Sequence, residues 1–171
     1  MNAAETGVRI AICDAPDAFC TRLRARFGLA PGGGASLSPR GLGYCGREFR
    51  AYPSMRIADA VRFYAALHAR WNGARLREHL ALAGLEERFE IGRMKRAFQR
   101  TLVLVLALAP EPDLLVVENA EEFDEERPHA LLQRAVDVVP RVVVTYAAGV
   151  TLPLAGLAPA IDAARYEAGH A

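Results

Sequence analysis

The sequence predicts an α/β domain in which a mostly parallel sheet is covered by helices. Two kinds of segment alternate along the chain: short continuous apolar runs, and longer segments whose apolar residues recur every three or four positions. Runs of the first kind are typical of strands buried on both faces, and those of the second kind of amphipathic helices. Their alternation is the pattern of layered α/β domains. A chain of 171 residues is long enough to form one such domain with a hydrophobic core.

Strands are predicted where β-branched and other apolar residues run together. The sequence VRIAIC over 8–13 is the first such run, and a shorter strand can form over 41–45. LLVV over 114–117 and RVVVTY over 141–146 are continuous apolar runs of strand length. We therefore expect buried strands in these segments.

Helices are predicted in the segments between these strands. The apolar period gives helices over 15–27, 55–71, 74–82, 92–108 and 124–139. Gly84 is suited to end the helix that precedes it, and Pro110 and Pro112 stop the next one. Asp124 can cap the following helix, whose first turns tolerate Pro128. In the irregular tail, about 149–171, a short helix is expected over 160–167.

Composition and charge exclude several classes of protein. The formal net charge is +1, so global charge indicates neither nucleic-acid wrapping nor binding to an anionic membrane. Three cysteines, none in a CxxC pair, are too few for a disulfide framework and are expected to be small buried hydrophobes. The longest apolar run, 102–109, is far shorter than the ~20 residues of a membrane span. With no recognisable signal peptide, a cytoplasmic protein is expected.

One glycine motif at 41–46 fits G-x-G-x-x-G. Dinucleotide binding through this motif needs a strand before it, a helix after it and an acid about 20 residues further on. Here the tripeptide SPR precedes the motif, and 47–53 has the composition of a loop. A glycine-rich strand edge is therefore the favoured interpretation.

Ionisable residues form no recognisable catalytic or metal-binding constellation. The acidic run ENAEEFDEE over 118–126 lacks partners from other elements, so a solvated loop before a helix is favoured over a metal site. The basic residues of 93–100 could bind phosphate, but a solvated helix start is favoured. The four histidines are scattered and are expected on the surface or on helix faces. We predict neither a metal nor a cofactor.

The order of elements resembles an ATP-binding-cassette (ABC) ATPase subunit. The resemblance covers about 8–147 of a single domain, 1–171, whose helical part is about 55–109. It is carried best by Tyr52-Pro53 with the following RFYAAL, and by 107–117, which is similar to the family's run from the signature helix into hDPxLLLLDEP. It implies a P-loop NTPase-like fold. The family's N-terminal antiparallel strands, with their adenine-stacking aromatic, are expected to be missing.

The phosphate loop departs from the family pattern GPNGAGKST. The matching stretch is DAPDAFCT over 14–21, which lacks the glycines whose backbone amides cradle phosphate. Cys20 stands in place of the lysine, and only Thr21 matches. The sole lysine of the chain, Lys95, lies elsewhere.

The other catalytic positions also depart from the family. Arg47 falls on the glutamine of the glutamine loop, Glu118 on the magnesium-supporting aspartate and Asn119 on the catalytic glutamate. The signature LSGGQ falls near 94–98, and the switch histidine falls near Ala147; Asp124 can keep the D-loop aspartate. Phosphoryl transfer depends on positioning and charge neutralisation, so we expect that ATP hydrolysis is lost.

The resemblance implies a docking role without chemistry. We expect an inactive subunit that docks on an ABC permease, an active ABC ATPase subunit or both, at the cytoplasmic face of the inner membrane through its partner. No nucleic-acid partner is expected. The docking residues implied beside the glutamine loop are Tyr44, Arg47, Phe49, Tyr52, Arg62 and Phe63.

Two alternatives belong to other classes of protein. The chain could be a stand-alone adaptor that uses the fold for assembly with non-transport proteins, because missing N-terminal strands would leave a sheet edge for a partner to cover. It could also sense a nucleotide or hydrolyse it weakly, although the phosphate-clamping groups of such chemistry are replaced.

Overall fold

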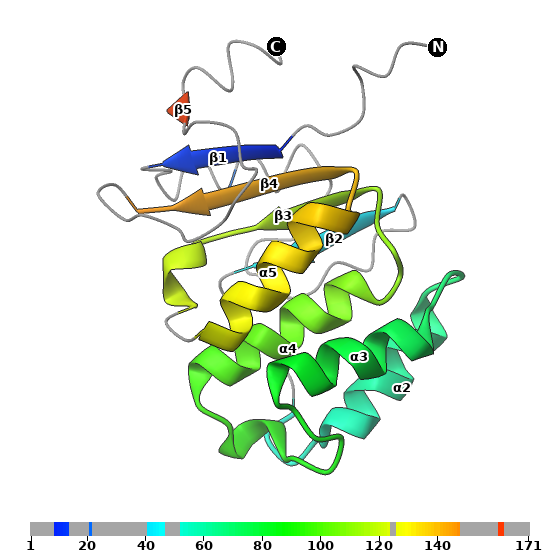
Figure 1. Cartoon of the computed structure of the whole chain (residues 1–171). Helices are drawn as coiled ribbons and strands as arrows, with labels where there is room; N and C mark the ends of the chain where they lie inside the picture. Colours follow the sequence, from blue (N-terminus) through cyan, green and yellow to red (C-terminus); the bar gives the residue numbers. More distant parts are fainter. Residues whose placement is uncertain are drawn as a thin grey trace.

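The strands form a single parallel sheet (Figure 1). A computed structural model of the chain describes residues 9–13, 21, 41–46, 52–123, 126–147 and 161–162. Its strand order is β2-β3-β4-β1-β5. The bounds are β1 Arg9–Cys13, β2 Leu42–Cys45, β3 Leu114–Val117, β4 Arg141–Tyr146 and β5 Ile161–Asp162. This mixed α/β architecture confirms the predicted fold class.

The central strands β3 and β4 coincide with the predicted segments. Leu115 pairs with Val142 and Val116 pairs with Val143, and all four side chains are buried. Apolar residues on both faces are what a strand between two layers requires. The sequence pattern therefore located the middle of the sheet correctly.

The short strand β5 corrects one prediction. A helix was expected over 160–167, but Ile161 pairs with Ile12 and Asp162 pairs with Cys13 in parallel register with β1. An exposed strand edge offers unpaired backbone groups, and pairing with it decides the conformation of these two residues. The local sequence pattern of 160–167 contains no information about this distant partner strand.

Helices lie against the sheet and extend away from it (Figure 1). The bounds are α2 Ile57–Leu67, α3 Gly73–Ala83, α4 Arg96–Leu108 and α5 Glu126–Val138, with short 3-10 turns η1 Ile91–Arg93 and η2 Ala120–Glu122. In Figure 1, α4 and α5 pack below the strands, while α3 and then α2 lie farther out. The core lies mainly between α4, α5 and the sheet.

The ends of α3 follow from its sequence. The side-chain oxygen of Asn72 accepts a hydrogen bond from the N–H of Arg75 at 2.9 Å and caps the first turn. Gly84 has φ of +68° and ends the helix, and its N–H donates to the carbonyl of Ala81 at 3.1 Å. The left-handed conformation favours glycine at this position, as the sequence predicted.

The start of α4 differs from the prediction of a helix from residue 92. Ile91–Arg93 is a 3-10 turn, and Lys95 is extended before the first residue of α4. The N–H of Gly92 donates to the carbonyl of Pro53 at 3.0 Å, and that of Ile91 donates to the carbonyl of Met55 at 2.9 Å. Lys95, which is extended, separates this turn from the regular helix, so α4 begins at Arg96.

The start of α2 is joined to the same segment. The N–H of Ile57 donates to the carbonyl of Phe89 at 3.0 Å, and the N–H of Ala58 donates to Glu87 at 2.9 Å. The first N–H groups of a helix lack partners within it, and here the chain before η1 supplies them. The helix spans Ile57–Leu67 and is therefore shorter than the predicted 55–71.

Some predictions fall at the margins of the described part. Of the helix predicted over 15–27, only Thr21 is described, and it is helical. The proposed cap Asp124 lies outside the described residues. Among the helices that the structure describes, none combines the length and the apolarity of a membrane span.

Candidate functional site

The carboxyl ends of β3 and β4 bring several polar groups together. Glu118 follows β3 directly and is fully buried, and its N–H donates to the carbonyl of Cys45 at 3.0 Å. Asn119 adopts the left-handed conformation with φ of +50°, which asparagine tolerates better than most residues. Its N–H donates to Oγ1 of Thr145, in β4, at 3.1 Å. Ligand sites of open parallel sheets lie at this edge, so these residues define the candidate site.

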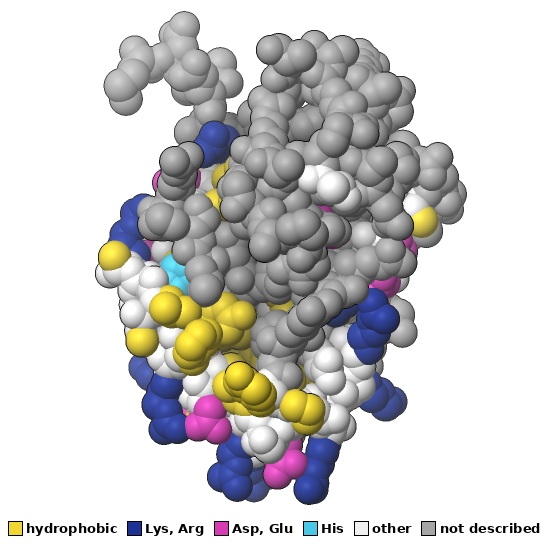
Figure 2. All heavy atoms as spheres, turned by 180° about the vertical axis from the view of Figure 1, so that it is seen from behind, with side chains coloured by type: hydrophobic (Ala, Val, Ile, Leu, Met, Phe, Trp, Pro, Cys, Tyr) yellow, Lys and Arg dark blue, Asp and Glu magenta, His cyan; other side chains and the backbone are white. Residues whose placement is uncertain are grey.

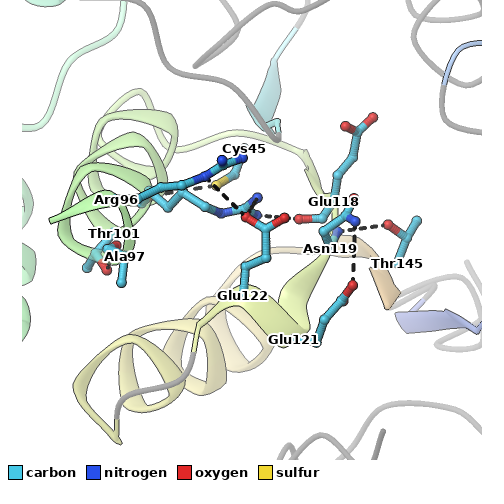
Figure 3. A network of polar contacts seen from close by, with 10 residues as sticks. Cys45, Arg96, Ala97, Thr101, Glu118, Asn119, Glu121, Glu122 and Thr145 are labelled. Atoms are coloured by element: carbon cyan, nitrogen blue, oxygen red, sulfur yellow. Dashed lines mark hydrogen bonds and ion pairs between the residues drawn. The ribbon is translucent and has the colours of Figure 1, made fainter. Parts of the chain in front are cut away.

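Buried Arg100 of α4 organises one side of the site. Its side chain is 2% exposed, and its guanidinium donates to the carbonyl of Glu118 and to Oε2 of Glu122 at 3.1 Å. The guanidinium also lies over the ring of Phe123, 5.0 Å from the ring centroid. Figure 3 shows Glu122 facing Arg96 as well, and those side chains form an ion pair at 3.7 Å. The arrangement fixes the loop after β3 against α4.

Cys45 is enclosed beside this network and is not suited to nucleophilic chemistry. Its Sγ lies 3.8 Å from the carbonyl oxygen of Arg100. Burial raises the pKa of the thiol to about 11, against a smaller lowering by Arg100. The nucleophilic form of cysteine is the thiolate, which is scarce at neutral pH when the pKa is this high. The buried position confirms the expectation that this cysteine is a small core residue.

The polar groups at the carboxyl ends of β3 and β4 are suited to fixing the conformation of the loop after β3. The neutral amide of Asn119 has no basic site at neutral pH, unlike the carboxylate of a general base. Its Nδ2 instead donates to Oε1 of Glu121 at 3.4 Å. Within the described part of the chain, no group of three or more His, Cys, Asp or Glu residues is placed to hold a metal ion.

The proposed docking residues separate into buried, exposed and undescribed ones. Tyr44 is 1% exposed and belongs to the core, so the prediction that it contacts a partner is wrong. It lies in β2, a strand whose four residues are all buried. Tyr52 and Phe63 are 76% and 55% exposed, and Arg62 is also exposed. Arg47 and Phe49 lie outside the described residues.

An exposed apolar surface runs along α2. Phe63 and Leu67 lie one turn apart on this helix, and both are exposed, as is Tyr52 just before it. Residues four apart in a helix share a face. Figure 2, seen from the side on which α2 lies, shows hydrophobic side chains gathered there, with lysine and arginine around them. We call Tyr52, Phe63 and Leu67 the α2 patch.

The structure describes only some of the positions that the resemblance matched to the catalytic motifs of the family. Cys20 and Asp124, like Arg47, lie outside the described residues, and Thr21 is exposed. Ala147 follows β4 and is exposed, without a side chain that could act as a switch. Glu118 and Asn119, matched to the magnesium-supporting aspartate and the catalytic glutamate, follow β3 directly. The positions matched to the signature, 94–98, lie at the start of α4.

Sequence reasoning missed the buried polar groups. The basic residues of 93–100 were assigned to a solvated helix start, which is wrong for Arg100. The acidic run was assigned to a solvated loop, but Glu118 is buried. His79 lies on a helix face, as expected, and that face of α3 is buried. The available signal was the position of Arg100 two residues before the apolar run that begins at Leu102, which indicates the buried end of that helix.

The glycine motif does not have the geometry of a dinucleotide site. Residues 42–45 form β2, paired with β3, instead of a turn between a strand and a helix. A Cβ at Gly43 would lie 2.7 Å from the carbonyl oxygen of Ala107, so glycine permits α4 to pack closely on the strand. The structure supports the favoured interpretation of a glycine-rich strand.

Comparison with known proteins identifies the fold. No family model and no curated protein sequence matches the chain. An ATP-binding protein assigned to an ABC transporter of Pyrococcus furiosus is similar over 92% of this chain and 85% of its own, with a TM-score of 0.67 and 14% identity. A cobalt transport ATP-binding protein is similar over 85% of this chain, with a TM-score of 0.62 and 18% identity; the chain spans only 60% of its length.

A third similar structure is a dimeric ATP-binding cassette in a post-hydrolysis state, bound to ADP and phosphate. It matches 85% of this chain and 77% of its own, with a TM-score of 0.60 and 16% identity. At identities this low the likeness establishes architecture and not activity, since one fold can host many functions. The chain has the fold of the ATP-binding cassettes of ABC transporters.

Proposed function

We propose that the chain is a catalytically inactive subunit with the ABC-cassette fold that docks on a membrane permease. An active ATPase subunit would supply the hydrolysis in such a complex. The observation that carries the proposal is the α2 patch, in which Phe63 and Leu67 of α2, and Tyr52 before it, expose large apolar side chains. Clustered exposed apolar side chains are typical of protein–protein contact sites.

The α2 patch has the properties of a docking surface. Aromatic side chains bury a large area at low cost in side-chain entropy and are common anchors of interfaces. Phe63 is backed by Tyr64 in an edge-to-face contact with ring centroids 5.7 Å apart. The first turn of α2 is held by backbone hydrogen bonds to residues 87 and 89. The patch is therefore presented on a fixed helix, which suits an amphipathic helix of a permease as its occupant.

Replaced residues support the absence of catalysis. The resemblance puts Cys20 in place of the phosphate-binding lysine and Asn119 in place of the catalytic glutamate. Lys95, the sole lysine, lies just before α4, at the positions matched to the signature. Phosphoryl transfer relies on positioned cations and on a residue that orients the attacking group, and these replacements remove both.

Nucleotide binding tests the inactive state directly. We expect no heat in calorimetry with millimolar magnesium ATP and no rise in melting temperature. A ligand at ~100 times its dissociation constant would stabilise the fold by about 2.7 kcal/mol, which both measurements would detect. Saturable binding with turnover would contradict the proposal; saturable binding without turnover would favour a nucleotide-sensing role.

Docking is tested by co-expressing the tagged chain with ABC permease and ATPase subunits encoded in the same genome. We expect a permease, identified by mass spectrometry, to co-purify with the chain and to be lost with Phe63→Ser. Leu82→Ser is a matched control because Leu82 is an exposed apolar residue of α3. Equal recovery with the two variants would argue against the α2 patch. Recovery of a non-transport protein alone would favour the adaptor alternative.

A further inference from the structure

A second surface feature lies away from the strand ends and outside the α2 patch. It is a groove of about 580 Å³ between the connection from α3 to α4 and the start of α5. Its apolar lining comes from Leu85, Phe89, Met94 and Phe98. We call it the α3–α4 groove. Its volume falls in the range of ligand-binding clefts, and its apolar lining is suited to an apolar side chain.

The rim of the α3–α4 groove is strongly basic. Among the described residues that line it, Arg88, Arg93, Lys95 and Arg127 are basic and Glu90 is the one carboxylate. Arg93 is ion-paired with Glu90, with Nε and Oε2 2.6 Å apart. Arg88 is likewise ion-paired, with Glu86, so the excess of positive charge that an acidic ligand would neutralise comes from Lys95 and Arg127.

Lys95 and Arg127 are the cations available to such a ligand. Arg88 is ion-paired with Glu86 at 2.7 Å, whereas neither Lys95 nor Arg127 has an ion-pair partner in the described part of the chain. Both side chains are exposed. Arg127 lies across the end of α3, because a Cβ at Gly84 would be only 2.0 Å from its guanidinium. Glycine thus serves a second purpose here: it leaves room for a cation at the rim.

We propose that the α3–α4 groove binds an acidic peptide segment of a partner protein, with an apolar side chain inserted between carboxylates. The apolar floor disfavours a bare inorganic anion, which would gain nothing from Phe89 and Phe98. The basic rim disfavours a basic amphipathic helix through like-charge repulsion. In an acidic segment with a leucine or aromatic residue, the carboxylates would pair with the basic rim and the apolar side chain would pack on the apolar floor of the groove. This inference does not rest on docking through α2, which uses another surface.

A peptide-display selection on the full-length protein tests the proposal. The probe is a library of short random peptides, and selected sequences are then synthesised and titrated by fluorescence anisotropy. We expect Asp and Glu to be enriched on both sides of a leucine or aromatic residue. Binding should weaken as salt is raised, because exposed charge pairs are screened.

Matched variants locate the binding to the groove. Lys95→Glu and Arg127→Glu should each weaken a selected peptide by about tenfold or more, as expected for loss of a charge-assisted contact. Arg77→Glu makes the same charge change on an exposed part of α3 outside the groove, and it should leave affinity within about threefold, since distant charges are screened. Met94→Gln keeps the length of a side chain in the groove floor but makes it polar. It should weaken peptide binding without changing the melting temperature.

Melting curves establish that each variant remains folded. Selected peptides without acidic enrichment would overturn the proposal. So would equal affinity for wild type, Lys95→Glu and Arg127→Glu. Binding of inorganic phosphate or ATP that is lost in these variants, with no peptide selected, would make the groove a small-anion site instead.

Discussion

Helices α4 and α2 are both amphipathic, but they use their apolar residues differently. In α4 every residue from Arg100 to Leu108 is buried. In α2 only Ile57 and Ala60 are buried, and Phe63 and Leu67 face solvent. One helix therefore builds the core, and the other carries a surface that the described part of the chain leaves uncovered.

The contrast shows where stability and recognition reside in this fold. Arg100 in buried α4 donates to the carbonyl of Glu118 and to the carboxylate of Glu122, whereas its Nε is buried without a hydrogen-bond partner among the described residues. Changes in α4 should reduce the free energy of unfolding. Changes on the outer face of α2 should leave folding nearly intact and affect binding alone.

The largest expected effect on the free energy of unfolding is in α4. Leu104 is fully buried, so Leu104→Ala should lower the free energy of unfolding by about 3–4 kcal/mol through lost burial and a residual cavity. Leu67→Ala in α2 removes the same atoms from an exposed position and should cost less than about 1 kcal/mol. Urea denaturation followed by circular dichroism measures both. Similar losses would show that the two helices are packed alike.

The buried arginine gives the next largest effect. Arg100→Ala removes the donors to Glu118 and Glu122 and the contact with Phe123, and it should cost about 2–3 kcal/mol. Arg100→Met retains much of the volume without the charge and should cost less, because an apolar replacement avoids desolvating a guanidinium. Denaturation midpoints of the two variants measure the difference. Arg100→Met equal to or worse than Arg100→Ala would assign the effect to charge rather than packing.

A smaller, pH-dependent effect is expected from His79 of α3. Burial, with Arg134 and Arg75 nearby, lowers its pKa from 6.5 to about 4, against a smaller opposing effect of Glu78. The unfolded chain binds a proton below pH 6.5 and the folded chain only near pH 4. Stability from neutral His79 is therefore complete above pH 6.5 and lost as pH falls towards 4, by about 1–2 kcal/mol.

Substitution of His79 isolates this contribution from carboxylates that titrate in the same range. We expect the stability of wild type, relative to His79→Leu, to decline between pH 6.5 and 4. Chemical denaturation at a series of pH values measures the difference. A difference that stays constant across this range would rule out the depressed pKa.

The smallest effect on folding is expected on the α2 side. Phe63→Ser should change the free energy of unfolding by no more than about 0.5 kcal/mol, although it should abolish recovery of the permease. Thermal melting beside the co-purification assay measures the two effects on one preparation. A large loss of stability would place Phe63 in the core and remove the basis of the comparison.

Sequence patterns located the elements that are defined by local chemistry. The segments 114–117 and 141–146 were predicted with their observed bounds, because continuous apolar runs fit strands covered on both faces. Gly84 marked the end of α3 because its left-handed conformation favours glycine. In the candidate site, the sequence placed Glu118 and Asn119 directly after a buried strand, and they directly follow β3 in the structure.

The remaining features depend on contacts between distant segments. Gly92 is held by Pro53, and the helical period of 92–108 gives no sign of that partner. Ile161 becomes a strand residue because β1 lies beside it. Arg100 looks like a solvated cation in sequence, and only the meeting of α4 with the loop after β3 makes it a buried one. Tyr44 is buried in β2, which pairs with the distant segment β3.

The backbone hydrogen bonds at the start of α2 give the two proposed binding surfaces a common support. Carbonyls of residues 87 and 89 hold the first turn of α2, and Phe89 also lines the α3–α4 groove. If an occupant of the groove changes the position of residue 89, it changes the cost of orienting α2 for a second partner. Thermodynamic linkage makes this reciprocal: the factor by which a peptide alters permease affinity equals the factor by which the permease alters peptide affinity. The two associations would in this way depend on each other, whether or not the chain itself performs catalysis.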